Sequence, residues 1–479
     1  MNKLAALCVL FLTACVCLRA QAQQPDASTA DSKTLDAIRD AALASDWAYE
    51  RLADLTDLIG PRLSGSPQAQ AAVEQVAAAL RAEGLKVTLQ PVRVPHWVRG
   101  EEHCELVDYP QRPAGITQRI HLTTLGGSMA TPVQGIVAPI LVVTSFADLA
   151  EHALEARGRI VLFDVAFDQT LAENGQAGAA YGQGSTYRRL GATAAAKVGA
   201  VAALVRSVGG ANYRLTHTGQ MNYQPNVAKI PTAAVTAEDA ALISRLARRG
   251  TVTMKLILTP QSLPDVDSFN VVADWVGSEK PDEVVLVSGH LDSWDLATGA
   301  IDDGAGVAAA MGVAHIFKQL NLHPKRTLRV VAWMSEENGS SGGQAYFDAN
   351  KHLIDRHAAV IESDIGAGTP LGIAGYATPK TLTRLQSVRD ALLTIGATVL
   401  ERSDRPLGSD ISQWQQAGVP GFEPLLDARH YFDYHHTAAD TLDKVDPKNL
   451  RRMVATLGVL AFHLADATQM PDRVLVPNP

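Results

Sequence analysis

Seven residues of the types that bind metal ions are spread along the C-terminal half of this 479-residue chain. They are His290, Asp292, Asp302, Glu336, Glu337, Asp364 and His436. Imidazole and carboxylate groups are typical ligands of divalent cations, and two cations held close together can activate water for hydrolysis. This set of residue types therefore predicts a two-metal hydrolytic site.

The first two motifs each have a structural and a chemical interpretation. Asp292 stands two residues after His290, where a carboxylate can accept the second ring N–H of a metal-binding histidine and fix its tautomer. Asp302 and Asp303 precede Gly304 at the start of a predicted helix, where acidic residues stabilise the helix dipole. The chemical alternative is that one of these two carboxylates bridges two metals, with one oxygen toward each.

The adjacent pair Glu336 and Glu337 is the most informative motif. Neighbouring residues point in different directions, so one glutamate can bind a metal while the other faces the attacking water as a general base. A solvated loop is the simpler interpretation of two glutamates considered alone. Asp364 and His436 each add one further candidate ligand.

The elements expected around these residues place them at one edge of a sheet. Apolar, β-branched runs predict strands at 284–288, 328–333 and 358–362, and helices are expected between them at 304–320 and 343–350. Strands that alternate with helices predict an α/β fold with a doubly wound, mainly parallel sheet. His290, Glu336 and Asp364 each follow a strand, at the carboxyl ends where such sheets bind ligands.

The N-terminal half predicts a different organisation. A helical region is expected over 34–58, a helix capped by Ser66 ends at Gly84, and a strand covers 87–94. Between 97 and 264, strands are expected at 136–143, 159–164 and 202–206, and helices at 187–198 and 237–249. We find no histidine and carboxylate cluster in that middle region. Its isolated His217 is interpreted as a surface or internally satisfied residue and not as a ligand.

Length and composition exclude several classes of protein. A chain of 479 residues is expected to form two domains. Hydrophobic residues make up 47% and charged residues 19%, which is typical of globular proteins. The net charge of -8 and the lack of a basic stripe argue against a nucleic-acid partner.

The first 22 residues resemble a secretory signal peptide. Lys3 precedes an apolar run at 4–18, and Ala20-Gln21-Ala22 has the small-residue pattern of a cleavage site. The run is shorter than a membrane span, and no later run reaches that length. We therefore expect a secreted or periplasmic protein. The segment ending at Cys15 also resembles a lipoprotein cleavage box, so anchoring at Cys15 is the alternative.

Cysteine usage agrees with removal of this segment. Three of the four cysteines, at positions 8, 15 and 17, lie inside it, so Cys104 alone would remain. No intrachain disulfide is then expected, and Cys104 is predicted to be a packed thiol.

The motifs together resemble the co-catalytic di-zinc exopeptidases, a family that includes bacterial leucine aminopeptidases and glutamate carboxypeptidases. The shared order is His-x-Asp, Asp-Asp-Gly, Glu-Glu, Ser-Asp and His-Thr-x-x-Asp-Thr. The similarity is strongest to the plasma glutamate carboxypeptidase group, over residues 59–66, 288–295, 299–306, 407–412 and 431–441.

The resemblance implies a zinc exopeptidase fold with a mixed sheet and an inserted, β-rich protease-associated domain. The implied order is a signal peptide at 1–22, the first part of the catalytic domain at 23–96, the insertion at 97–264 and the rest of the catalytic domain at 265–479. It further implies two Zn²⁺ per chain and a homodimer.

Site roles also follow from the resemblance. It assigns His290, Asp302 and Asp364 as ligands of one zinc ion. By the same resemblance, Asp302 also binds the second zinc ion as a bridge, together with Glu337 and His436. It implies that Glu336 is the general base and that Asp292 orients His290. A cis peptide bond between Asp302 and Asp303 is expected as well. His435 is the rival of His436, which is preferred because the family's ligand directly precedes serine or threonine.

The expected activity is hydrolysis of dipeptides or short peptides with free termini, and aminopeptidase action on longer peptides is the alternative. Tyr431 or Tyr434 is a candidate donor to the oxyanion. Ser409 and Asp410 match a motif near the substrate pocket, and Asp410 is a candidate partner of an amino terminus.

The sequence also contains patterns typical of two other functions, and binding without catalysis is a third alternative. Residues 339–343 fit G-x-S-x-G, which would make Ser341 the nucleophile of a serine hydrolase, although Glu336 and Glu337 separate it from the preceding strand. Residues 304–309 loosely fit a dinucleotide fingerprint but do not directly follow a strand. A peptide-binding homologue without activity would be expected to lack a ligand or the base, and none is missing.

Overall fold

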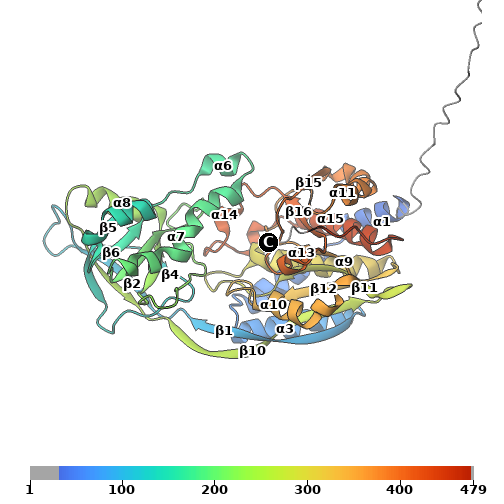
Figure 1. Cartoon of the computed structure of the whole chain (residues 1–479), viewed down its shortest axis with the longest axis horizontal. Coiled ribbons are helices and arrows are strands. Elements are labelled where there is room, and N and C mark those ends of the chain that lie inside the picture. The colour runs from blue at the N-terminus through green and yellow to red at the C-terminus, as the bar shows by residue number, and fades with distance from the viewer. Residues whose placement is uncertain (1–31, 476–479) are drawn as a thin grey trace, which may run out of the picture.

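The computed structural model describes residues 32–475 and contains two eight-stranded sheets side by side (Figure 1). The expected signal peptide and the alternative lipoprotein site at Cys15 lie outside the described residues. Of the described helices, none is both long and apolar enough to cross a membrane.

The first sheet carries the strands predicted in the C-terminal half. In spatial order its strands are β1 (Lys86–Val98), β10 (Gln261–Trp275), β12 (Arg326–Trp333), β11 (Lys280–His290), β13 (His357–Glu362), β16 (Gly421–Leu426), β14 (Pro370–Tyr376) and β15 (Val399–Arg402). The central strands β12, β11, β13 and β16 run parallel. Antiparallel pairs join β1 to β10, β10 to β12 and β14 to β16, and β15 pairs parallel with β14. This confirms the predicted mixed α/β sheet.

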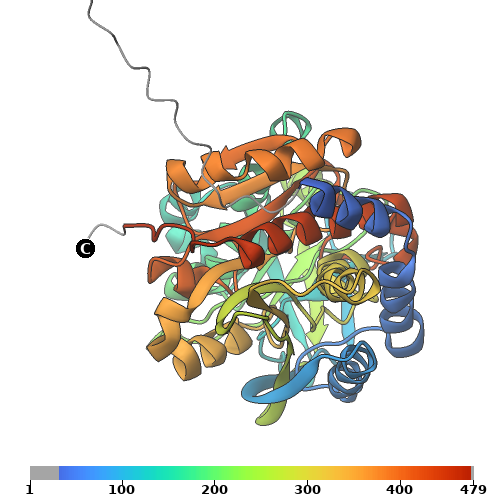
Figure 2. The same cartoon turned by 90° about the vertical axis from the view of Figure 1, so that its right-hand side faces the viewer.

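Helices cover both faces of this sheet (Figure 2). Val285 and Val287 pack into a core with α9 (Ala305–Gln319) and α15 (Pro447–Asp466). Val284 and Leu286 point the other way, into a core with α10 (Ser341–Asn350) and α13 (Ser412–Gln416). Because both faces are buried, the strands are continuously apolar, which is the pattern that identified them in the sequence.

The N-terminal helices differ from the prediction in one respect. The region 34–58 is not one helix, because α1 (Ser32–Leu43) ends before α2 (Trp47–Ala53) and the π-helix η1 (Asp54–Ile59) begin. The hydroxyl of Ser45 accepts the Trp47 N–H at the break, and short polar side chains of this kind compete with helical hydrogen bonds. The next helix, α3 (Pro67–Ala82), starts as predicted, with Ser66 as its N-cap.

The second sheet is built from strands between residues 102 and 258. In spatial order they are β3 (Gln118–Arg119), β2 (Glu102–Asp108), β9 (Thr253–Leu258), β5 (Ile136–Val143), β6 (Ile160–Phe163), β7 (Ala202–Arg206), β8 (Thr232–Val235) and β4 (Leu122–Thr124). Its helices are α4 (Phe146–Glu151), α5 (Ala153–Ala156), α6 (Gln169–Glu173), α7 (Ala177–Lys197) and α8 (Ala237–Ala247). This sheet has hydrophobic cores of its own, one of which contains Cys104.

We call the part built around the first sheet the first half of the molecule and the part built around the second sheet the second half. Two connections join them. The long strands β1 and β10 pair with each other and run beneath both parts of the molecule (Figure 1). Helix α7 also lies beside α14 (Tyr431–Tyr434) of the first half. The remaining short helices are η2 (Ala300–Gly304), η3 (Lys351–Arg356), α11 (Pro379–Arg384), α12 (Gln386–Ala391), η4 (Leu393–Ile395) and η5 (Leu442–Lys444).

Candidate metal centre

The predicted ligands meet at the carboxyl edge of the parallel strands. His290 is the last residue of β11, Glu337 follows β12 and Asp364 follows β13. Asp302 comes from η2, and His436 follows α14. The side chains of all five are buried or nearly so. Elements far apart in sequence therefore bring the whole set into one small volume.

The carboxylate of Asp302 stands between two groups of ligand atoms. Its Oδ1 is 3.2 Å from His290 Nε2, which is also 3.2 Å from Asp364 Oδ1. Its Oδ2 is 3.1 Å from His436 Nε2, which is 3.0 Å from Glu337 Oε2. Two triads that could each hold a cation thus share Asp302.

The electrostatics of the cluster fit bound cations. Burial raises the pKa of Glu337 to about 8 and that of Asp364 to about 6. The second carboxylate oxygen of Glu337 is buried without a hydrogen-bond partner. Buried carboxylates are costly unless they are paired or bind metal, so this donor set is chemically suited to two divalent cations.

Asp303 belongs to neither triad but holds the main chain beside them in place. Its Oδ2 accepts the main-chain N–H of His290 at 3.0 Å, and its Oδ1 accepts that of Gly306 at 3.0 Å. The peptide bond between Asp302 and Asp303 is cis, as the resemblance implied.

Asp292 contacts His290 mainly through its main chain. His290 Nδ1 lies 2.9 Å from the carbonyl oxygen of Asp292 and 3.9 Å from its carboxylate. That carboxylate instead accepts the main-chain N–H groups of Ser335 at 2.7 Å and Glu336 at 3.1 Å. Asp292 therefore connects the turn that carries Glu336 to the turn that carries His290.

Glu336 lies beside the ligand cluster, at the wall of a cavity. Its side chain is partly exposed, forms no ion pair among the described residues, and lines a cavity of about 390 Å³ together with Asp302, Glu337 and Asp364. A carboxylate in this position can accept a proton from a water molecule inside the cavity.

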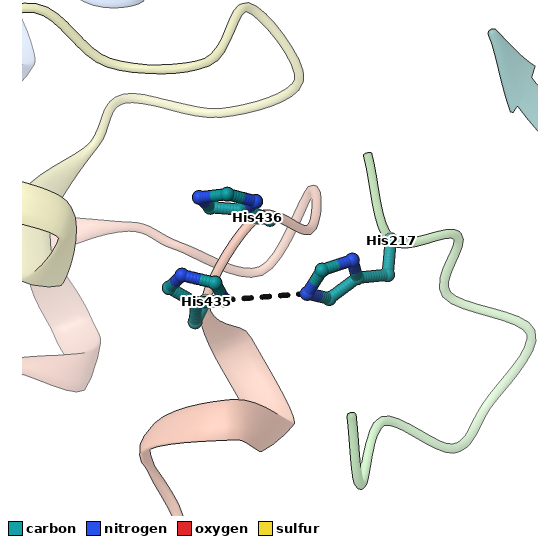
Figure 3. A group of neighbouring side chains, drawn as sticks. All are labelled: His217, His435 and His436. Atoms are coloured by element: carbon teal, nitrogen blue, oxygen red, sulfur yellow. Dashed lines mark hydrogen bonds between the residues drawn. The ribbon is translucent and has the colours of Figure 1, made fainter. Parts of the chain in front are cut away.

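The prediction that His217 is isolated is wrong. His217 is fully buried, and its Nε2 lies 3.2 Å from Nδ1 of His435, beside His436 (Figure 3). Burial lowers the pKa values of His217 and His435 well below the ordinary value, which keeps both rings neutral near pH 7. His217 belongs to a loop of the second half that packs on the segment after α14, 218 residues away in sequence.

The second half also supplies part of the cavity wall, which sequence reasoning missed. The lining residues from this half are Tyr181, Arg188, Arg189, Gln220 and Asn222. The main-chain N–H of Gly210 donates to the Phe432 carbonyl at 3.1 Å, and that of Thr218 donates to the His436 carbonyl at 3.0 Å. No local motif marks these residues, because their role depends on contact between the two halves.

The other residues singled out in the sequence have distinct positions. Ser409 and Tyr431 line the cavity, whereas Tyr434 lines a neighbouring pocket. Asp410 is buried and accepts the Gly343 N–H at 3.1 Å, so it does not face the cavity as a partner for an amino terminus.

The rival motifs gain no support from the fold. The Ser341 hydroxyl contacts that of Ser335 at 3.4 Å, and none of its hydrogen bonds among the described residues involves a histidine. Residues 304–309 span the end of η2 and the start of α9 and do not follow a strand, which is the wrong context for a dinucleotide loop.

Comparisons with known proteins identify the family of the chain. Residues 270–461 match the family model described as Peptidase family M28. Carboxypeptidase Q from Homo sapiens is 42% identical over 433 residues, which cover 90% of this chain and 88% of the relative. The Bos taurus protein of the same name is 41% identical over 436 residues, covering 90% and 88%.

Solved structures show the same relationship. The peptidase M28 precursor from Shewanella amazonensis superposes with a TM-score of 0.87 at 35% identity, covering 93% of this chain and 99% of that one. BSAP, a zinc aminopeptidase from Bacillus subtilis, has a TM-score of 0.61 at 20% identity over 86% and 93% of the two chains, which shows a shared fold. The chain therefore belongs to peptidase family M28, with carboxypeptidase Q among its relatives.

Proposed function

We propose that this peptidase is a di-zinc exopeptidase that hydrolyses dipeptides or short peptides with free termini. The observation that carries the proposal is the position of Asp302, whose two carboxylate oxygens face two separate triads of metal-type ligands. A shared carboxylate of this kind suits a pair of cations.

The metal sites are proposed from the donor atoms. His290, Asp302 and Asp364 would hold one zinc ion, and Asp302, Glu337 and His436 the other. Bound zinc lowers the pKa of water and polarises a carbonyl group. The unpartnered oxygen of Glu337 supports a cation at the second position. Zinc is favoured by the imidazole and carboxylate donors and by the shared fold with BSAP, which is a zinc aminopeptidase.

Glu336 is proposed as the general base. It takes a proton from the attacking water and transfers it to the amine that leaves, so the peptide bond breaks and both new termini are protonated correctly. Its position at the cavity and its freedom from ion pairs support this role. Asp292 keeps its main chain in place through two short hydrogen bonds to the same turn.

The charges of the cavity wall support a substrate with a free carboxyl terminus. The second half contributes the guanidinium groups of Arg188 and Arg189, which suit a substrate carboxylate. Arg189 is exposed and forms no ion pair among the described residues, so it remains available to a ligand.

Product analysis tests this function. Purified protein is incubated with a dipeptide, its N-acetylated form, its C-amidated form and a pentapeptide, with and without a chelator, and the products are identified by mass spectrometry. We expect the free dipeptide to be cleaved fastest and the chelator to stop cleavage. Stepwise trimming of the pentapeptide from its amino end at an equal rate would instead support the aminopeptidase alternative.

We further propose export through residues 1–22, an inserted domain at 97–264 and a homodimer. Mass determination of the mature N-terminus separates cleavage after Ala22 from lipid attachment at Cys15. Light scattering after size-exclusion chromatography tests the homodimer.

A further inference from the structure

Two adjacent histidines face the same carboxylate. His435 Nε2 lies 3.4 Å from Asp302 Oδ2, and His436 Nε2 lies 3.1 Å from the same oxygen. Their rings are stacked (Figure 3), with centroids 3.6 Å apart. Both residues line the cavity. A metal ligand needs a bare Nε2, whereas a hydrogen-bond donor needs a proton on Nε2. The position of one proton on each ring therefore separates their roles.

The carbonyl group of Thr218 determines which ring nitrogen of His436 carries the proton. His436 Nδ1 lies 3.3 Å from the main-chain oxygen of Thr218, which can only accept, so Nδ1 carries the hydrogen and Nε2 is bare. Arg188 Nη1 lies 3.4 Å from the same nitrogen but has acceptors elsewhere, in the Tyr181 hydroxyl and the Thr218 carbonyl. The bare Nε2 of His436 faces Glu337, as a ligand should.

For His435 the proton position depends on His217. The two rings share one hydrogen between His217 Nε2 and His435 Nδ1. The other nitrogen of His217, Nδ1, is buried without a hydrogen-bond partner. Buried N–H groups without an acceptor are rarer in proteins than acceptors without a donor, so Nδ1 of His217 is the bare nitrogen. His217 therefore donates through Nε2 to His435 Nδ1.

This donation leaves His435 with its proton on Nε2, at the cavity. The main chain of His217 is held in place by a hydrogen bond, in which its N–H donates to the Ser207 hydroxyl at 3.0 Å. The Tyr181 ring lies against both histidines, with centroids 5.5 Å from His217 and 5.1 Å from His435. His217, a residue of the second half, thus determines that the ring nitrogen of His435 at the cavity carries the proton.

We propose that His435 is a catalytic hydrogen-bond donor to the scissile carbonyl oxygen and that His217 is the positioning residue that fixes its tautomer. This inference rests on the proposed peptide hydrolysis. As water attacks, the carbonyl oxygen gains negative charge, and a fixed N–H in a water-poor site stabilises that charge. The proton stays on Nε2 throughout, so His435 neither gains nor loses a bond to hydrogen.

The first experiment separates a donor from a ligand. His435→Ala, His435→Gln and His436→Ala are loaded with zinc, and zinc per chain is measured by mass spectrometry. We expect both His435 variants to keep the wild-type zinc content, whereas His436→Ala loses one equivalent. In His435→Ala, kcat should fall by about 10²- to 10³-fold with KM little changed. His435→Gln, whose amide can donate, should recover part of the loss.

Binding of a phosphinic dipeptide analogue gives a readout that is independent of turnover. Its tetrahedral, anionic centre resembles the transition state, so its affinity should fall in His435→Ala by a factor similar to that for kcat. His352→Ala is the matched control, because His352 is an exposed histidine in η3. It should leave zinc content, kcat and analogue affinity unchanged.

A matched pair at His217 tests the tautomer. In His217→Gln the amide can still donate to His435 Nδ1, and kcat should stay within about tenfold of wild type. In His217→Glu the carboxylate accepts instead, which moves the His435 proton to Nδ1 and should lower kcat toward the His435→Ala level. Thermal melts identify any variant that fails to fold, and nitrogen-15 spectra of histidine-labelled wild type read the tautomers directly.

Two results would overturn the inference. One is loss of a zinc equivalent in His435→Ala, which would make His435 the ligand. The other is a wild-type spectrum in which His435 carries its proton on Nδ1. If wild type cleaved no peptide at all, the proposed function would fail separately, because zinc content and tautomers are measured without turnover.

Discussion

Thr218 contacts both the main chain and the ring of His436. Its main-chain N–H donates to the His436 carbonyl at 3.0 Å, and its own carbonyl lies 3.3 Å from Nδ1 of the His436 ring. His436 has a left-handed backbone with φ of 59°, a conformation that surrounding contacts must maintain in a residue other than glycine. A loop of the second half is therefore part of the candidate metal centre and does more than cover it.

The shared carboxylate predicts unequal losses of metal. Asp302→Asn removes charge from both triads, so zinc content should fall by two equivalents per chain when the protein is dialysed against a weak chelator. Asp364→Asn affects one triad and should cost at most one equivalent. Equal losses in the two variants would show that Asp302 does not bridge. Zinc is measured by mass spectrometry, with circular dichroism as the control for folding.

The proposed base predicts a loss of turnover without loss of metal. Glu336→Gln keeps the size of the side chain but removes its basicity, so kcat should fall by about 10²- to 10⁴-fold while zinc content and KM stay near wild type. Steady-state kinetics on a dipeptide measure the change. Turnover at the wild-type rate would show that another group takes the proton from water.

Much of this fold was predictable because its signals are local. Strands β11, β12 and β13 are buried on both faces, so they appear in the sequence as continuous apolar runs, and their carboxyl ends locate His290, Glu336 and Asp364. The sharing of the triads by Asp302 was implied by family resemblance, because residue types alone left bridging and helix capping as equal alternatives.

The missed features depend on contacts between distant segments. His217 pairs with His435 across 218 residues, and no periodicity marks that contact. Helix α7 begins at Ala177, ten residues before the predicted start, because glycines at 178, 182 and 184 mask its helical pattern. Tyr181 lies in this missed part of the helix, so part of the cavity wall was overlooked with it. Arg188 and Arg189 fall inside the predicted helix, but no motif marks them as cavity residues.

Arg189 predicts how a substrate carboxylate is recognised. Removal of its guanidinium in Arg189→Ala should raise KM for a free dipeptide by about tenfold, since a charge-assisted hydrogen bond contributes about 1.5 kcal/mol or more. KM for the C-amidated dipeptide should not change. Arg245→Ala, at an exposed position on α8, is the control. An equal rise in KM for both substrates would assign Arg189 a role other than carboxylate binding.

A buried arginine is expected to stabilise the loop segments beside the candidate metal site. The Arg62 side chain donates to the carbonyls of Leu291, Gly299, Gly60 and Thr298, at distances from 2.6 to 3.1 Å. Arg62→Met should lower the free energy of unfolding by about 3–5 kcal/mol, because it leaves buried acceptors and acidic neighbours unpaired.

Urea titration followed by circular dichroism measures the effect of Arg62→Met. Arg93→Met provides the control, since Arg93 forms an exposed ion pair with Asp267 and should cost less than about 1 kcal/mol. Similar losses in the two variants would mean that the Arg62 network contributes no more than a surface pair.

His357 predicts a loss of stability in acid that is independent of the metal centre. Its Nδ1 lies 3.1 Å from the Leu353 carbonyl and its Nε2 lies 3.0 Å from the Tyr346 hydroxyl, so the neutral ring is fully paired. Burial lowers its pKa to about 4 from an ordinary 6.5. Below pH 6.5 the unfolded chain therefore binds a proton that the folded chain does not, and stability falls as pH decreases toward 4.

The expected loss from His357 is about 3 kcal/mol between pH 7.5 and pH 4, relative to a variant without the titrating ring. Urea titrations of wild type and His357→Gln at several pH values, all with chelator present, give this difference directly. The wild-type curve should fall more steeply in acid than the variant's, and His352→Gln should parallel wild type because that ring is exposed. Parallel curves for wild type and His357→Gln would show that the ring is protonated in the folded protein as readily as in the unfolded chain.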